Sequence, residues 1–274
     1  MSAASSRHVA VRAVGLGKSY RIASMERHGN LRDFLSAPLR RLAGVTTTRP
    51  SPPAHYGAPP GEPTGDGGFW ALREVSFELQ SGDTLGIVGG NGAGKSTLLR
   101  ILARVTRPTE GHAEVTGGIG SLLDVGTGFN AEFTGRENVY LSGAILGMRR
   151  REIDRKFDEI VAFAEIEPFI DQPVKHYSQG MYARIAFAVA AHLDTEILLI
   201  DDVFAIADAA FQERCRRKIG DVTRDGRTVL FVSHNMEAVN ELCRKAMLVE
   251  HGRVIEFGDT AEITRLHLRH QVGG

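Results

Sequence analysis

Apolar and polar residues follow one another in an order that predicts several strands. Alternating positions predict a short strand at 9–14, which ends near Tyr20, and another at 74–79. Almost continuous apolar runs are typical of strands buried on both faces of a parallel sheet. Such runs occur at 84–88, 197–200 and 229–232.

Helical spacing and turn residues complete the pattern. Helices are predicted at 96–103 and 149–167, whereas residues 134–147 show no clear period. Residues 246–257 predict a hairpin that turns at His251-Gly252. Asp259 and Glu262 have the spacing of a capping box and predict a final short helix within 259–274.

One long insertion interrupts this pattern. A single unit is expected at 7–258, with an insertion at 21–68. Residues 31–42 have apolar positions at helical spacing and predict an amphipathic helix, which Pro38 would kink. Residues 49–68 contain six prolines and five glycines and predict a disordered loop.

Composition excludes several classes of protein. The formal net charge is zero, so no overall field attracts the chain to nucleic acid, and no nucleic-acid partner is expected. Cys215 and Cys243 are isolated and are expected to be buried and reduced. No apolar run approaches the roughly 20 residues of a membrane-spanning helix, and residues 1–7 lack the apolar stretch of a secretory signal. The expected location is cytoplasmic, with binding to a membrane partner left open.

A glycine-rich loop after the apolar strand 84–88 predicts a phosphate site. It fits the pattern G-x-x-x-x-G-K-[ST], in which glycines let backbone N–H groups approach phosphate oxygens and the lysine supplies positive charge. The serine hydroxyl is a ligand for Mg²⁺. The predicted nucleotide-binding residues here are Gly89, Gly90, Asn91, Gly92, Ala93, Gly94, Lys95, Ser96 and Thr97.

Two further groups follow apolar strands. Asp201 comes directly after 197–200 and, with Ser96, is expected to hold Mg²⁺. His234 comes just after 229–232 and could contact a terminal phosphate or the attacking water. Taken alone, an acidic residue such as Asp201 is often just a solvated strand end, and a lone histidine is more often structural than catalytic.

A second phosphate-binding helix start is predicted near position 178. Ser178 can cap a helix through 181, 185 and 189, and Gly180 permits close approach of an anion. One nucleotide cannot easily meet both this helix start and the glycine loop within one chain. Two chains that sandwich nucleotides head to tail would satisfy both.

These motifs together resemble the ABC-type ATPase cassettes. Tyr177-Ser178-Gln179-Gly180-Met181 is similar to their signature motif, and the order of motifs also matches. Within that superfamily the chain resembles the ATPase subunits of polysaccharide and polyol-phosphate exporters, which move O-antigen, capsule, teichoic acid or galactan precursors. The resemblance covers 69–258 and 9–20. It is carried by the signature and by Phe69-Trp70-Ala71-Leu72, Thr134-Gly135-Arg136-Glu137-Asn138 and Asp208-Ala209-Ala210-Phe211-Gln212.

The resemblance implies a fold and a set of roles. The fold would be an α/β P-loop ATPase with a RecA-like core, an antiparallel β subdomain and a helical signature subdomain at about 126–193. Tyr20 would stack on adenine, with Phe69 or Trp70 as weaker candidates, and Asp208 would communicate across the dimer. Asp202 and His234 would be catalytic. The signature residues that would bind nucleotide are Ser178, Gln179 and Gly180.

The implied cofactors and partners follow from the same resemblance. The chain would bind ATP and Mg²⁺, pair with a second copy, and drive a membrane-spanning permease from the cytoplasmic face of the inner membrane. A glycan or polyol-phosphate polymer would be contacted mainly through the permease. The helix at 31–42 would lie near that permease, or else cover the domain's own core. No carbohydrate-binding domain is expected after 259–274.

Three departures from the family pattern bear on activity. Asp202 stands where the family usually has a catalytic glutamate, and a carboxylate displaced by about 1 Å can lower a rate ~10²-fold. No glutamine is evident in 122–132, where Gly126-Thr127-Gly128-Phe129 occurs instead. Ala207 replaces the glycine that usually precedes Asp208. Because of Asp202, an alternative function remains: an ATP-gated regulatory subunit that hydrolyses ATP slowly or not at all. A soluble ATPase acting on ribosomes or DNA is a further alternative.

Overall fold

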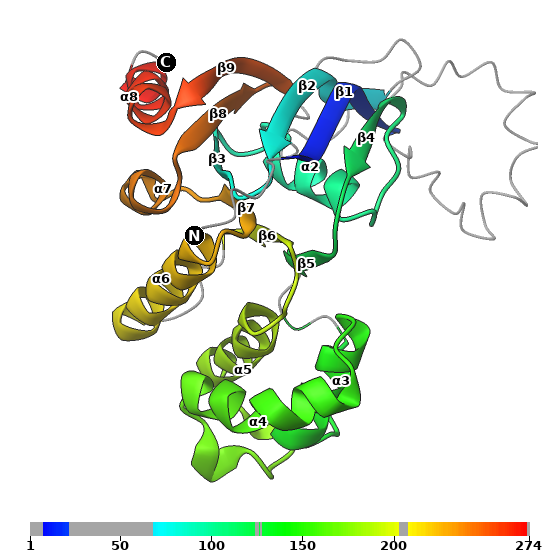
Figure 1. Ribbon diagram of the computed structural model, residues 1–274, viewed down its shortest axis with the longest axis vertical. Coiled ribbons are helices and arrows are strands. Elements are labelled where there is room, and N and C mark those ends of the chain that lie inside the picture. Colours follow the sequence, from blue (N-terminus) through cyan, green and yellow to red (C-terminus); the bar gives the residue numbers. More distant parts are fainter. Residues whose placement is uncertain (1–7, 22–67, 124–125, 127, 203–207, 273–274) are drawn as a thin grey trace, which may run out of the picture.

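The computed structural model describes residues 8–21, 68–123, 126, 128–202 and 208–272, in which two sheets are flanked by helices (Figure 1). The helix expected at 31–42 and the loop expected at 49–67 lie outside the described residues. Gly68, which we expected at the end of that loop, instead begins a strand.

A six-stranded sheet forms the centre of the molecule. Its order is β5 (Ile119–Leu122), β6 (Ile197–Asp201), β7 (Thr228–Val232), β3 (Thr84–Val88), β8 (Lys245–Glu250) and β9 (Arg253–Asp259). The first five strands are parallel and β9 runs antiparallel to β8. The apolar runs predicted as buried strands are confirmed as β3, β6 and β7. Their carboxyl ends meet at one edge of the sheet.

A three-stranded antiparallel sheet covers one side of this core. Its order is β2 (Gly68–Gln80), β1 (Val9–Arg21) and β4 (Glu110–Val115). Helix α2 (Lys95–Leu102) packs against both sheets through buried leucine and isoleucine side chains, in one apolar core. In the β1–β2 hairpin Tyr20 pairs with Phe69, and Arg21 pairs with Gly68. The insertion therefore leaves and rejoins the fold at neighbouring strand ends.

The other face of the central sheet is covered by α6 (Ala209–Arg224), α7 (Met236–Leu242) and α8 (Thr260–Val272). Cys215 and Cys243 are both buried in this core as free thiols, as the sequence indicated. Burial raises the pKa of each thiol to about 12. Neither cysteine is therefore suited to act as a nucleophile.

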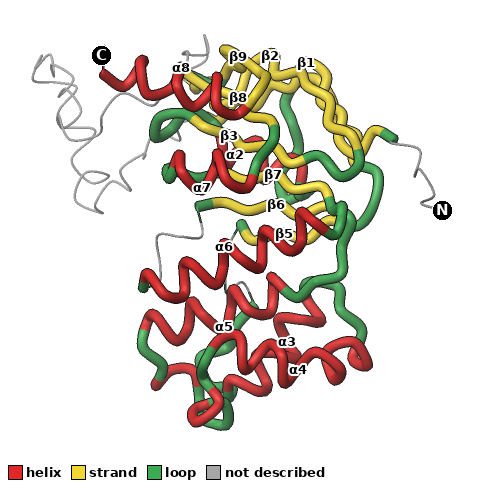
Figure 2. Tube along the Cα trace, turned by 60° about the vertical axis from the view of Figure 1, so that its left-hand side comes forward, coloured by secondary structure: helices red, strands yellow, loops and turns green. Residues whose placement is uncertain are grey.

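A separate helical group lies below the sheets in Figures 1 and 2. It consists of α3 (Gly135–Ile145), α4 (Arg150–Ala164) and α5 (Gln179–Ala191), with short 3₁₀ turns at Glu167–Phe169 and Val174–His176. These helices share their own apolar core, and α6 lies between this group and the strands (Figure 2). Among the described residues, no helix combines the length and the apolar character that crossing a bilayer requires.

Candidate nucleotide site

The loop between β3 and α2 depends on glycine at both of its ends. Gly89 has φ +149°, and a Cβ atom there would lie 2.1 Å from the carbonyl oxygen of Val249 in β8. Gly94 has φ +106°, and a Cβ atom there would lie 2.4 Å from the carbonyl oxygen of Ala71 in β2. Only glycine fits these two positions without a shift of backbone. The two sheets thus fix the course of a loop whose N–H groups can cradle an anion.

Lys95 occupies the first position of α2 and bends back over this loop. Its Nζ atom donates to the carbonyl oxygens of Gly89 and Gly90, each at 2.8 Å. Burial lowers the pKa of Lys95, and the carboxylates of Asp201 and Asp202 act in the opposite direction. The ammonium group is thus held at the predicted phosphate site, close to both acids. Ser96, next along α2, is exposed.

The predicted acidic and histidine residues meet beside Lys95. Asp201 is the last residue of β6, and the backbone N–H of Asp202 donates to the carbonyl oxygen of Val232 at the end of β7, at 3.0 Å. Asp202 has φ +41°, a left-handed conformation that aspartate tolerates better than most residues. Nε2 of His234 lies 4.0 Å from Oδ2 of Asp202. The ends of three adjacent strands therefore bring one lysine, two carboxylates and one imidazole together.

A cavity of about 200 Å³ connects this loop to the aromatic pair on the hairpin. The ring centroids of Tyr20 and Phe69 are 5.9 Å apart, and Nζ of Lys18 lies 5.1 Å from the Tyr20 ring centroid. An aromatic wall next to a phosphate cradle has the two parts that a nucleotide needs, one for its base and one for its phosphates. The lining residues are Tyr20, Phe69, Ala71, Gly92, Ala93, Gly94, Lys95, Ser96 and Thr97.

The second predicted phosphate-binding turn lies far from this cavity. Ser178 caps α5, accepting a hydrogen bond from the N–H of Met181 at 3.2 Å, as predicted. Gln179 is exposed, and the nearest atom to a Cβ built on Gly180 is Oγ of Ser178 at 3.8 Å. Figures 1 and 2 show α5 in the helical group, away from α2. The structure therefore does not bring Ser178 to the phosphate loop within one chain.

Asp208 begins α6 and joins it to α5. Its Oδ1 atom accepts from the N–H of Phe211 at 3.0 Å, and Oδ2 forms an ion pair with Arg184. The hydrogen bond from Phe211, followed by the bond from Arg184, lowers the pKa of Asp208. The carboxylate is therefore ionised at neutral pH and holds two helices together.

Comparison with known proteins identifies the family. The family model described as "ABC transporter" matches residues 72–205. The chain is 41% identical over 199 residues to the O-antigen export system ATP-binding protein RfbB of Klebsiella pneumoniae, covering 73% of this chain and 81% of that protein. The chain belongs to the ABC transporter family.

Two other relatives extend well beyond the matched part. The ABC transporter protein AbcA of Aeromonas salmonicida is 45% identical over 204 residues, which are 74% of this chain and 66% of AbcA. The teichoic acids export ATP-binding protein TagH of Enterococcus faecalis is 40% identical over 197 residues, which are 72% of this chain and 44% of TagH. The chain thus spans less than two thirds of either relative.

Comparison with a solved structure supports the fold class. The dimeric post-hydrolysis state of the ATP-binding cassette MJ0796, bound to ADP and Pi, superposes with a TM-score of 0.67 at 20% identity, covering 91% of this chain and 98% of that one. The predicted fold class is confirmed: an α/β P-loop ATPase with a parallel core, an antiparallel β subdomain and a helical part that carries the signature.

Within this ABC fold, the segment Thr134-Gly135-Arg136-Glu137-Asn138 builds the start of α3. Thr134 and Glu137 form a capping box, since each side chain bonds the other's backbone N–H. The fully buried Asn138 donates to three carbonyl oxygens, those of Asn130, Phe133 and Thr134, at 2.9 to 3.1 Å. Capping rather than apolar periodicity defines this helix, which is why the sequence showed no clear period here.

Two of the departures from the family pattern involve residues that the structure does not describe. These are Ala207, before Asp208, and Thr127, within the glycine-rich stretch 126–129. The carbonyl oxygen of Gly126 accepts from the hydroxyl of Tyr182 in α5 at 3.1 Å, and the ring of Phe129 packs edge-on against Tyr182 at 5.1 Å. This glycine-rich stretch is therefore attached to the signature helix.

From the sequence, Phe69 is a weaker candidate than Tyr20 for stacking on adenine, and Arg184 has no predicted role. Phe69 lines the cavity, whereas Trp70, the other weak candidate, packs near Gly17 instead. Strand alternation, which sends neighbouring residues to opposite faces, was the signal that could have separated them. Arg184 contacts partners far away in sequence, which no local pattern reveals.

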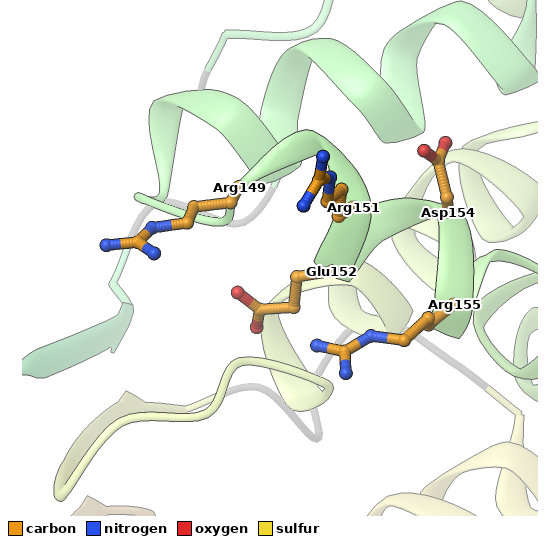
Figure 3. A pocket seen from close by; sticks show the side chains of 5 residues that line it. All are labelled: Arg149, Arg151, Glu152, Asp154 and Arg155. Carbon is orange, nitrogen blue, oxygen red and sulfur yellow. The ribbon is translucent and has the colours of Figure 1, made fainter.

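A second hollow lies at the start of α4 and has a different character. Figure 3 shows its lining side chains fanning outwards from a single stretch of helix, with basic and acidic groups mixed. It has no glycine loop and no aromatic wall, so we do not assign nucleotide binding to it. The lining residues are Arg149, Arg151, Glu152, Asp154 and Arg155.

Proposed function

We propose that this chain is the ATP-hydrolysing subunit of an ABC exporter that moves a lipid-linked polysaccharide or polyol-phosphate polymer across the cytoplasmic membrane. The observation that carries the nucleotide part of this proposal is the cavity in which Tyr20 and Phe69 adjoin the phosphate loop. The polymer class is supported by the printed names of RfbB and TagH, which are O-antigen and teichoic acid export proteins.

The residues present fit ATP with Mg²⁺. The loop from Gly89 to Thr97 would bind the phosphates, and Tyr20 would stack on the base. Among the described residues there is no cluster of three or more His, Cys, Asp and Glu side chains suited to a metal ion. Mg²⁺ in nucleotide sites usually binds through one or two carboxylates together with substrate phosphates and water, so one strand-end carboxylate beside a phosphate loop is enough. Ser96 and Asp201 would be those groups, and the ion would neutralise phosphate charge.

Asp202 and His234 would prepare the water that cleaves the terminal phosphate. In hydrolysis the water oxygen bonds to the γ-phosphorus, the bond to ADP breaks, and the water proton leaves towards a nearby base. The carboxylate of Asp202 and the imidazole of His234 lie next to each other and close to the Lys95 charge. They are the groups that can orient that water and accept its proton.

Two copies would be needed for a complete site. Ser178, Gln179 and Gly180 lie away from the phosphate loop of their own chain, so they would complete the partner's site, and Asp208 would lie at the same junction. Closing and opening of this pair would move a membrane-spanning permease. The chain would bind the permease at the cytoplasmic face of the inner membrane, and the polymer would be contacted mainly through the permease.

The test is polymer export in cells that carry Lys95→Ala in place of the natural chain. Lipid-linked polymer should accumulate inside the cell and disappear from the surface, at an unchanged level of the protein. Lys175→Ala, which removes an exposed ion pair with Glu132, is the matched control and should export normally. Normal surface polymer in the Lys95→Ala cells would refute the proposal.

A further inference from the structure

Arg184 connects three elements of the helical group and the core. It lies on α5, and its Nη1 atom donates to Oε2 of Glu165, directly after α4, at 3.0 Å. Its Nη2 atom forms the ion pair with Asp208 at the start of α6. The guanidinium carbon lies 5.3 Å from the ring centroid of Phe211, and only 21% of the side chain is exposed. Arg184 is therefore held in one position by two carboxylates and a ring.

Both oxygens of Asp208 are used, and for different purposes. Oδ1 caps α6 through the N–H of Phe211, while Oδ2 holds Arg184. The Asp208–Arg184 pair thus ties the cap of α6 to α5, next to the packing of Phe211 against Phe187. Arg184 lies on α5 and Ser178 caps the start of that helix, so this pair also relates Asp208 to the signature turn.

The rest of α6 is attached to the helical group independently. Arg214 forms an ion pair with Glu165, and Lys218 forms one with Glu159 at 3.1 Å. These contacts lie one to three turns further along α6. Removing Arg184 should therefore free the Asp208 carboxylate without detaching α6, because these two pairs and the packing of Phe211 against Phe187 remain.

We propose that Arg184 is a positioning residue that keeps the signature turn and Asp208 at a fixed separation, so that both reach the partner copy's nucleotide site in one closing movement. This inference rests on the two-copy arrangement of the proposed function. The guanidinium suits the task because its planar fork can bond two carboxylates at once, whereas an ammonium acts as a point charge.

The test compares nucleotide binding with ATP-driven pairing in Arg184→Met. ATP affinity is measured on the dilute chain, and pairing is measured by light scattering in an Asp202→Asn background, where hydrolysis does not reopen the pair. We expect unchanged ATP affinity, and a loss of pairing affinity of roughly tenfold. In the otherwise natural chain, kcat should fall by a similar factor while KM stays the same. Arg184→Lys, which retains the charge without the fork, should show a smaller loss.

Arg136→Met supplies the matched control, because the Arg136–Asp171 pair also joins arginine to aspartate at 2.7 Å within the helical group. It should keep ATP-driven pairing and kcat. Thermal unfolding of each variant identifies any that fails to fold, and Arg184→Lys then takes the place of Arg184→Met. Normal pairing and kcat in both Arg184 variants would overturn the inference alone. Absence of ATP-driven pairing in the natural chain would overturn it together with the proposed function.

Discussion

Nε2 of His234 lies 4.0 Å from Oδ2 of Asp202, where the loops after β7 and β6 meet. This is the arrangement of a base beside a group that can orient water or share its proton. Removing the negative charge with Asp202→Asn should lower kcat by ~10²-fold or more, while ATP still binds. Single-turnover hydrolysis alongside equilibrium ATP binding measures both. Equal loss of binding and turnover would contradict a catalytic role.

The shorter carboxylate at this position has a structural reason. Asp202 adopts φ +41°, a conformation in which aspartate is several-fold enriched over most side chains. Aspartate should therefore suffice, and Asp202→Glu should change kcat by less than about tenfold, against the ~10²-fold that a misplacement of about 1 Å can cost. A rise of ~10²-fold on substitution would instead support the ATP-gated, slowly hydrolysing subunit.

The fit of the phosphate loop against the small sheet predicts a large difference between two glycines. Gly94→Ala should destabilise the fold by about 2–4 kcal/mol, because its Cβ would lie 2.4 Å from the Ala71 carbonyl oxygen and its φ is +106°. Gly90→Ala should be nearly neutral in stability, since no atom lies within 4 Å of a Cβ there. Urea unfolding measures both, and equal stabilities would contradict the packing described for this loop.

The aromatic wall predicts an effect specific to the base of the nucleotide. Tyr20→Ala should weaken ATP binding by roughly 5- to 100-fold, the range that loss of one base–aromatic stack produces. Tyr20→Phe should bind nearly as the natural chain does. Inorganic tripolyphosphate has no base, so its affinity should be the same in all three proteins. Isothermal titration provides these values, and a loss of tripolyphosphate binding in Tyr20→Ala would show that the residue acts on the loop instead.

The capping box of α3 predicts a pH-dependent contribution to stability. Hydrogen bonds from the backbone and side chain of Thr134 lower the pKa of Glu137 in the folded chain. The contribution is therefore present above the unfolded value of about 4.3 and is lost as pH falls through the lower folded value. Glu137→Ala should be less stable than the natural chain at pH 7.5, and the difference should shrink below pH 4. A difference that grows on acidification would contradict this assignment.

Parts of the fold could be predicted because local sequence decides them. The strand before the phosphate loop is almost entirely apolar and fully buried, and the hairpin at His251 and Gly252 has positive φ at both residues. Strands β4 and β5 were not predicted, because β4 has no buried residue to give it an apolar face and β5 has only four residues. These two strands form because they pair with neighbouring strands, not because their own residues show a strand pattern.

The candidate nucleotide site also has some residues that local sequence locates and others that only the folded structure brings together. Motif spacing located the phosphate loop and the strand-end residues Asp201 and His234. Tyr20 and Phe69 face each other on paired strands. Their pairing could not be predicted, because residues 22–67 separate the two strands in the sequence and hide the register in which they pair. The bridge from Arg184 to Glu165 and Asp208 joins helices that meet only when the helical group packs on α6.

The proposed function requires that this chain turn over ATP to drive a membrane partner. The decisive experiment is ATP hydrolysis by the purified chain, alone and co-expressed with a membrane-spanning partner, with Lys95→Ala as the control. We expect turnover that rises with the partner and vanishes in Lys95→Ala. ATP binding without turnover in either setting would contradict the proposed function and would favour an ATP-gated clamp.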